Sequence, residues 1–148
     1  KGGQGTDGAI HFKAGPKLLA YCLYISGCSV GDAVITPGFL LPAQFVIHAV
    51  GPVYEGLGGN EPELLRSAYT QSLQRCIEQN IESISFPSIS TGAFCYPLKK
   101  AAPIAAQAIV GFLRSEKHSL GLVRMVLYPK EQSKAVQIYK AAFKDCCD

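Results

Sequence analysis

The chain has 148 residues, of which 48% are hydrophobic and 17% are charged, and its net charge is +3 at pH 7. This composition excludes a disordered chain, and so small a net charge argues against the clustered basic face of a nucleic-acid binder. We therefore expect a single domain over residues 1–148, long enough to bury a hydrophobic core.

Six cysteines are spread along the chain, and no two of them form a C-x-x-C pair. This spacing favours free thiols in a reducing compartment over a disulfide framework, and it shows no paired ligand spacing of a zinc site. No signal peptide and no apolar run of about 18 residues is present. We expect no membrane contact and an intracellular location, cytoplasmic or nuclear.

The first half of the chain begins with a glycine-rich loop over residues 1–6, and Asp7 is a favoured residue for the helix start that follows. Apolar residues then recur at mixed spacings of three and four. They predict one helix or two short helices interrupted near Gly15 and Pro16. A short strand at 33–36 and a strongly β-prone strand at 45–50 come next.

The second half alternates helices with strands. After a glycine-rich loop, the pattern predicts a helix at 61–79, a strand at 81–86, a helix at about 97–115, a strand at 122–128 and a helix at 131–144. This alternation predicts an α/β layered domain with a mixed or parallel sheet.

The stretch Ser85–Pro97 passes from a predicted strand through a loop into a predicted helix. Such a loop gathers free backbone N–H groups, and together with the helix dipole they favour an anion such as phosphate. Ser90, Thr91 and Gly92 let the backbone approach a ligand closely, and Phe94 and Tyr96 could stack on a flat ring or close over a sugar. The alternative is an ordinary strand-to-helix turn with a helix cap.

Three segments, in this order and at this spacing, resemble a macrodomain. They are Gly2-Gly3-Gln4-Gly5-Thr6-Asp7-Gly8-Ala9-Ile10-His11, then Leu41-Pro42-Ala43 with Val46-Ile47-His48-Ala49-Val50-Gly51-Pro52, then Phe86-Pro87-Ser88-Ile89-Ser90-Thr91-Gly92-Ala93-Phe94-Cys95-Tyr96-Pro97. The nearest pattern is the MacroD-type branch, which includes bacterial O-acetyl-ADP-ribose deacetylases. The resemblance implies a three-layer α/β/α macrodomain-like fold with a mixed, mostly parallel central sheet.

The resemblance also implies an ADP-ribose pocket in which two loops clasp the diphosphate. Asp7 is then the catalytic residue, placed beside the distal ribose to orient or activate water, while Phe94 lies against that ribose and Tyr128 flanks the adenosine. The substrate-binding residues implied in this way are Gly3, Gln4, Gly5, Thr6, Gly8, Ile10, Ser90, Thr91, Gly92, Ala93, Phe94 and Tyr128. No metal and no cofactor is required, and the expected partners are ADP-ribose or ADP-ribosylated proteins.

The sequence departs from the family pattern in three places. The strands and the Asn-Ala-Ala-Asn run that precede the glycine loop in the family are absent from it. We expect that an amino-terminal portion is missing or that another chain supplies it, and that a sheet without those strands exposes an apolar edge. Gln4 interrupts the glycine run. Cys95 stands where close relatives usually have glycine, and it is strained if that position needs a positive φ.

Several residues also have plain structural interpretations. Asp7 could be only a helix cap, and His11 and His48 fit structural histidines better than catalysts. Cys95 has no neighbouring base in the sequence that would make it a nucleophile.

Three functions stay open at this point. The first is hydrolysis of an ADP-ribosyl ester, on a mono-ADP-ribosylated protein or on O-acetyl-ADP-ribose. The second is a binding module that reads ADP-ribose without turnover. The third, an inactive structural domain, is favoured if Gln4 and Cys95 distort the loops.

Overall fold

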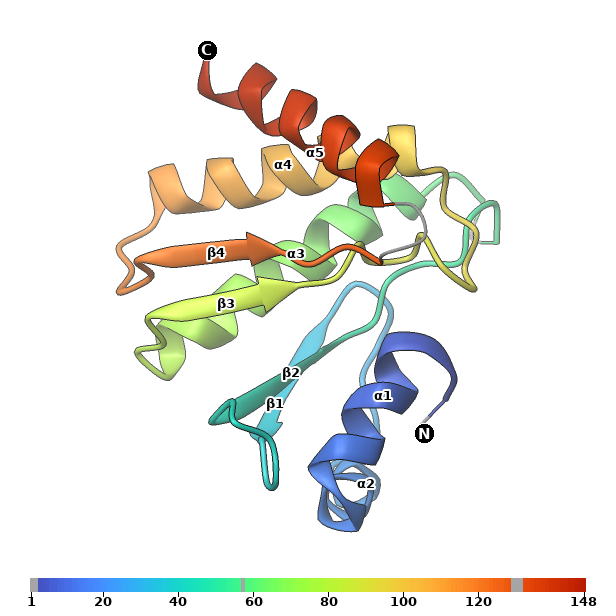
Figure 1. The fold of residues 1–148 in the computed structure, drawn as a ribbon, viewed down its shortest axis with the longest axis vertical. Coiled ribbons are helices and arrows are strands. Elements are labelled where there is room, and N and C mark those ends of the chain that lie inside the picture. Colours follow the sequence, from blue (N-terminus) through green and yellow to red (C-terminus); the bar gives the residue numbers. More distant parts are fainter. Residues whose placement is uncertain (1–2, 57, 129–131) are drawn as a thin grey trace.

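The computed structural model describes residues 3–56, 58–128 and 132–148. Figure 1 shows its helices and strands, which alternate as the sequence predicted. In chain order they are α1 (Gly5–Ala14), α2 (Pro16–Tyr24), β1 (Ala33–Pro37), β2 (Phe45–Ala49), α3 (Glu61–Glu78), β3 (Ser83–Phe86), α4 (Leu98–Ser115), β4 (Leu122–Met125) and α5 (Gln132–Cys147).

The predicted interruption of the first helix falls at Gly15. This residue has a φ of +83°, a left-handed conformation that glycine adopts without steric cost. Pro16 follows at the first position of α2, where the missing N–H of proline costs no hydrogen bond. The two residues therefore end one helix and begin the next.

The strands form two separate pairs. β1 and β2 are antiparallel, with Ile35 opposite Ile47, and β3 and β4 are parallel, with Ser85 opposite Arg124. Within the described residues no ladder joins β2 to β3, and a cavity lined by residues of both strands lies between them. The α/β class is as expected, but the expected single sheet is divided into one antiparallel and one parallel pair.

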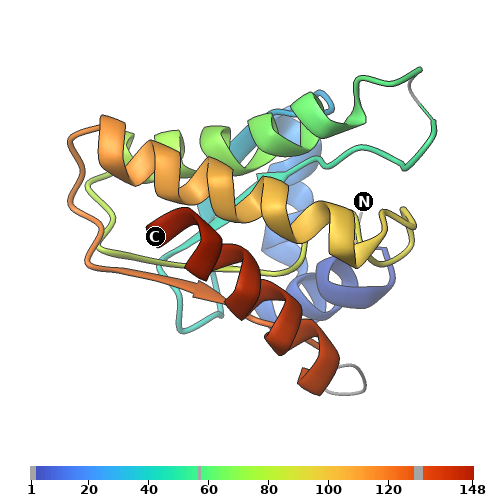
Figure 2. The same ribbon diagram turned by 90° about the horizontal axis from the view of Figure 1, so that it is seen from above.

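The main hydrophobic core lies between the β3–β4 pair and three helices, and Figure 2 shows α3, α4 and α5 side by side over these strands. Helix α4 packs between α3 and α5. Its buried face is made mostly of alanines, at positions 101, 102, 105, 106 and 108. Small side chains let neighbouring helices approach closely, so this face fixes the helical layer.

Helix α3 links the two halves of the molecule. It contacts β1 and β2 as well as α4, while α2 contacts β1. Figure 1 shows α1 and α2 beside the β1–β2 pair and α4 and α5 beside the β3–β4 pair. In the described part of the chain, no helix is long and apolar enough to cross a lipid bilayer.

Candidate functional site

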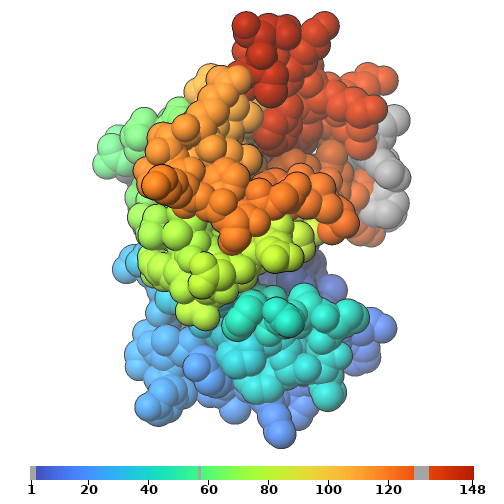
Figure 3. All heavy atoms as spheres, turned by 90° about the vertical axis from the view of Figure 1, so that its left-hand side faces the viewer, coloured from blue at the N-terminus to red at the C-terminus, as the bar shows by residue number. Residues whose placement is uncertain are grey.

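A cavity of about 1500 Å³ occupies the space between the two strand pairs. Its wall includes Thr6, Asp7 and Ile10 from the first helix, and Ser90 and Phe94 from the loop after β3. Residues 11–89 separate these two segments in the sequence. Figure 3 shows the β1–β2 turn below the segment that leads into β3, and residues of both segments also line the cavity.

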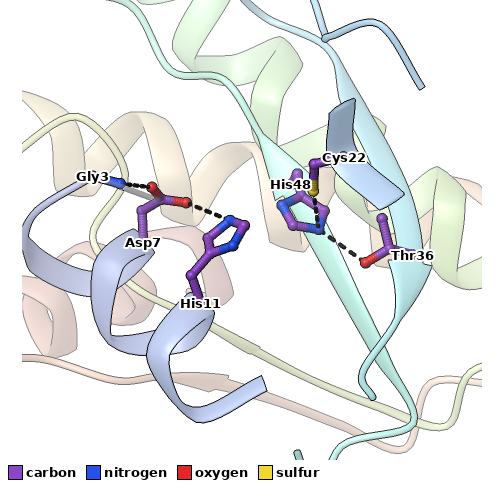
Figure 4. A network of polar contacts seen from close by, with 6 residues as sticks. All are labelled: Gly3, Asp7, His11, Cys22, Thr36 and His48. Carbon is purple, nitrogen blue, oxygen red and sulfur yellow. Dashed lines mark hydrogen bonds and ion pairs between the residues drawn. The ribbon is translucent and has the colours of Figure 1, made fainter. Parts of the chain in front are cut away.

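Asp7 lies in the first turn of α1, and its side chain is 52% exposed. One carboxylate oxygen accepts the backbone N–H of Gly3 at 2.6 Å, and the other lies 3.5 Å from Nε2 of His11 (Figure 4). Helix N-termini favour negative charge because their first N–H groups lack partners within the helix. Asp7 therefore lies inside the first turn and in the cavity wall, and the alternative that it is only the helix cap was wrong, because Gln4 holds the N-cap position.

Glycine is required in this turn because the backbone folds tightly. A Cβ added at Gly8 would lie 1.9 Å from the carbonyl oxygen of Gly3, so a larger residue would push the glycine loop away from the helix. Gln4 has a φ of −86° and precedes the helix as its N-cap. Because this conformation is open to any residue, glutamine at this position does not distort the loop.

The loop of residues 88–96 is held from behind by buried tyrosines. The Tyr69 hydroxyl accepts the backbone N–H of Ile89 at 3.1 Å, and the Tyr139 hydroxyl lies 2.6 Å from Oγ of Ser88. Within the loop, the Thr91 hydroxyl donates to the carbonyl of Ser88 at 2.9 Å. Side chains from α3 and α5 thus fix the loop before any ligand is present.

Three consecutive backbone N–H groups of this loop, those of Gly92, Ala93 and Phe94, have no acceptor among the described residues. The flanking N–H groups are used internally, since Cys95 donates to Gly92 at 2.9 Å and Tyr96 donates to Ser90 at 2.9 Å. Successive free N–H groups form a concave anion-binding arrangement. The loop thus has the main-chain donors that an anion site needs, and anion binding stays a prediction.

The candidate site residues fall into three groups, according to whether they line the large cavity, a smaller cavity or neither. Thr6, Asp7, Ile10, Ser90 and Phe94 line the large cavity. Gly3 and Gly8 line a smaller cavity of about 360 Å³ nearby. The remaining candidates, Gln4, Gly5, Thr91, Gly92, Ala93 and Tyr128, lie outside both walls, and their ligand contacts stay predictions.

The two aromatic residues of the loop differ. Phe94 is 39% exposed and borders the cavity, whereas Tyr96 is 3% exposed and belongs to the core. Its ring packs against Tyr54 with 5.0 Å between centroids. The suggestion that Tyr96 stacks on a ligand was therefore wrong, because its ring is needed to seat the loop on the core.

Sequence spacing missed one group in the cavity wall. His11, Cys22 and His48 come from α1, α2 and β2 and approach one another there (Figure 4). Burial lowers the pKa of His48 and neighbouring His11 lowers it further, while burial raises the pKa of Cys22. Only the folded chain brings the three together, so no local motif could have indicated them.

The comparisons with known proteins agree with this arrangement. Residues 1–105 match the Macro domain family. The chain belongs to that family. A Macro domain-containing protein of Lactiplantibacillus plantarum is 45% identical over 127 residues, which span 86% of this chain and 74% of that protein. The human ADP-ribose glycohydrolase MACROD2 is 46% identical over 120 residues, which span 80% of this chain and 28% of MACROD2.

Solved macrodomains have the same fold. The Oceanobacillus iheyensis macrodomain with ADP superimposes with a TM-score of 0.90 at 39% identity, covering 98% of this chain and 77% of that one. The Trypanosoma brucei macrodomain in complex with ADP-ribose gives 0.82 at 34% identity, covering 99% of this chain and 58% of that one. The expected α/β macrodomain fold is confirmed.

Proposed function

We propose that this macrodomain binds ADP-ribose in the large cavity and hydrolyses an ADP-ribosyl ester. The observation that carries the proposal is the meeting of Asp7 with Ser90 and Phe94 in one cavity wall. Similarity to a protein named ADP-ribose glycohydrolase and to macrodomains solved with ADP and ADP-ribose supports the same ligand class. The substrate is then O-acetyl-ADP-ribose or a mono-ADP-ribosylated acidic side chain of a protein.

The diphosphate is assigned to the free N–H groups of Gly92, Ala93 and Phe94, together with the first turn of α1. Phe94 lines the large cavity, and Gly92 and Ala93 lie between it and Ser90 in the chain, next to the cavity wall. Main-chain donors can neutralise a diphosphate without lysines. This explains why a net charge of only +3 is sufficient for an anionic ligand. Phe94, which is partly exposed at the cavity, supplies an apolar surface for the distal ribose.

Asp7 is assigned the role of general base. Its carboxylate is oriented by the Gly3 N–H and by His11, and its side chain stays half exposed, so water can reach it. In the proposed step a water molecule attacks the ester while Asp7 accepts its proton. The bond between the acyl carbon and the ribose oxygen breaks, and Asp7 passes the proton to the departing ribose oxygen, so the products are a free ribose hydroxyl and a carboxylic acid.

Calorimetric titration with ADP-ribose tests binding. We expect saturable heat release from the 148-residue chain, and no detectable heat at millimolar ADP-ribose would contradict the ligand assignment. Gly92→Pro tests the loop at a position where an added Cβ meets nothing within 4 Å. Proline removes one of the three free N–H groups, so this variant should bind more weakly.

A turnover assay on O-acetyl-ADP-ribose tests catalysis. We expect Asp7→Ala to lower kcat by about 10²–10⁴-fold, the usual contribution of a positioned base. Asp145→Ala is the matched control, since Asp145 lies on α5 and outside the walls of both cavities. Unchanged turnover in Asp7→Ala would remove Asp7 from the mechanism.

A non-catalytic ADP-ribose reader is the second candidate. Solved macrodomains with ADP and in complex with ADP-ribose favour it, because binding without turnover is enough to account for such complexes. A reader would bind ADP-ribose in the calorimeter and release no product from either ester. The two assays together therefore separate an enzyme from a reader.

A further inference from the structure

His11, Cys22 and His48 form a compact donor cluster. One ligand atom from each side chain lies within 4.8 Å of the other two. The residues belong to α1, α2 and β2, so three separate elements support the cluster. All three residues line the large cavity, and Figure 4 shows them together with Asp7 and Thr36.

His11 is oriented as a metal ligand would be. Its side chain is 9% exposed, and Nε2 faces the carboxylate of Asp7 at 3.5 Å. Its other ring nitrogen, Nδ1, is buried and has no hydrogen-bond partner among the described residues. Metal-binding histidines almost always direct the second ring nitrogen to a carboxylate, carbonyl or water, which fixes the tautomer. The Asp7–His11 pair has this arrangement. Nε2 carries the proton toward Asp7, and the unprotonated Nδ1 is left to bind a metal ion.

His48 and Cys22 complete the donor set. Nε2 of His48 lies 3.9 Å from the Cys22 sulfur and 3.0 Å from the Thr36 hydroxyl. That hydroxyl also donates to the carbonyl of Pro37 at 3.1 Å, so it keeps a partner if His48 turns to an ion. Binding through Nε2 requires His48 to carry its proton on Nδ1.

We propose that His11, Cys22 and His48 bind a Zn²⁺ ion as its three protein ligands. One thiolate and two imidazoles form a borderline-soft donor set, which suits Zn²⁺ and disfavours Mg²⁺ and Ca²⁺. Zn–N and Zn–S bonds of about 2.1 and 2.3 Å place tetrahedral ligand atoms roughly 3.5 Å apart. The present atoms lie up to 4.8 Å apart, so the three side chains must draw together when an ion binds.

Three protein ligands leave a fourth coordination position, which opens to the cavity because all three residues line it. Water or an anionic ligand from the cavity can occupy this position. Coordination requires the thiolate, so Zn²⁺ binding releases the Cys22 proton to solvent. The proposal is independent of the proposed function, because metal content can be measured without ADP-ribose.

Cobalt titration tests the site in the chelator-treated 148-residue chain. We expect one equivalent of Co²⁺ to bind with a thiolate-to-cobalt charge-transfer band, and stoichiometric Zn²⁺ to displace it. Cys22→Ser should abolish the band. Cys28→Ser should retain it, because Cys28 is also half-buried but lies outside the cluster, with its thiol directed to the carbonyl of Ser29.

Histidine variants keep the test decisive if Cys22→Ser does not fold. Loss of an outer-shell partner lowers metal affinity by about 10–100-fold, and we expect Asp7→Asn to lower the Co²⁺ affinity within that range. His11→Gln and His48→Gln each remove a ligand, so each should lower the Co²⁺ affinity by more. The proposal is overturned by a wild-type chain that shows no thiolate band. It is also overturned by a band that survives in Cys22→Ser or disappears in Cys28→Ser, or by histidine variants that bind Co²⁺ like the wild type.

Discussion

The backbone N–H of Tyr54 donates to the carbonyl oxygen of Phe94 at 2.9 Å. This bond joins the loop after β2 to the loop after β3, although no ladder connects the two strands within the described residues. Gly51 lies against Ser90 beside it, so close that an added Cβ would stand 2.2 Å from the serine Oγ. The two strand pairs are thus fastened at the edge that carries the candidate site.

Gly51→Ala tests this fastening. The added methyl group would meet Ser90 Oγ at 2.2 Å and Ile89 Cγ2 at 2.5 Å, so the loop must shift. We expect the unfolding free energy to fall by about 1–3 kcal/mol, as overpacking does elsewhere, and ADP-ribose binding to weaken. Urea unfolding and calorimetry measure the two effects. Gly111→Ala is the control, because its Cβ meets nothing within 4 Å on α4 and should stabilise the helix.

Cys95→Gly should stabilise the chain. The sequence indicated that Cys95 is strained if its position needs a positive φ. Its φ is +57°, so this strain is present. Relief of left-handed strain exceeds the extra chain entropy of glycine, and we expect a net gain of roughly 0.5–1 kcal/mol. Cys95→Ala, which keeps a Cβ, should change the urea midpoint little. A lower midpoint in Cys95→Gly than in Cys95→Ala would contradict the prediction, since it would show that the chain entropy of glycine outweighs the relief of strain.

Cys76 predicts a loss of stability in alkali. Burial raises the pKa of its thiol from 9.0 to about 11, so the folded chain keeps a proton that the unfolded chain gives up. The contribution of the neutral thiol to the free energy of unfolding is fully present below pH 9.0 and is lost as the pH rises from 9.0 toward 11. Urea unfolding at several pH values should show a steeper decline in the wild type than in Cys76→Ala. Equal slopes would exclude this thiol as a source.

Ser83→Lys tests the unpaired edges between the sheets. Ser83 is exposed on β3 and lines the cavity beside β2. A lysine at an open edge discourages strand pairing with other chains, so light scattering on warming should rise several-fold more slowly than in the wild type. Ser115→Lys, at the exposed end of α4, adds the same charge away from the strands. Equal protection by both variants would attribute the effect to net charge alone.

Local sequence signals were sufficient for the elements and for most of their ends. The strand predicted to reach Tyr128 is the instructive exception, since β4 stops at Met125. Its neighbour β3 ends at Phe86, and Pro87 has no N–H to continue a ladder. The last bond runs from the N–H of Val126 to the carbonyl of Phe86. A strand's end is thus set by its partner, which a local pattern does not contain.

The candidate site was predictable only in part. The loop of residues 88–96 was predictable from the strand before it and from its glycine and hydroxyl residues. The proximity of Asp7 to Phe94 was predicted only from the family resemblance, because contacts between residues so far apart in the sequence leave no periodic signal. The sequence predicted an exposed sheet edge, but it did not predict that the strands divide into two separate pairs. The His11–Cys22–His48 cluster was not foreseen, since its members are 11 and 26 residues apart and lie on three elements.

The division of the strands into two pairs sets how the molecule can deform. Bonds and close contacts hold the carboxyl ends together through Tyr54 and Gly51, and α3 spans the rear. We therefore expect any movement of one pair against the other to widen the opposite rim first. Ser90 and Phe94 carry the fastening, so we expect the loop of residues 88–96 to change least.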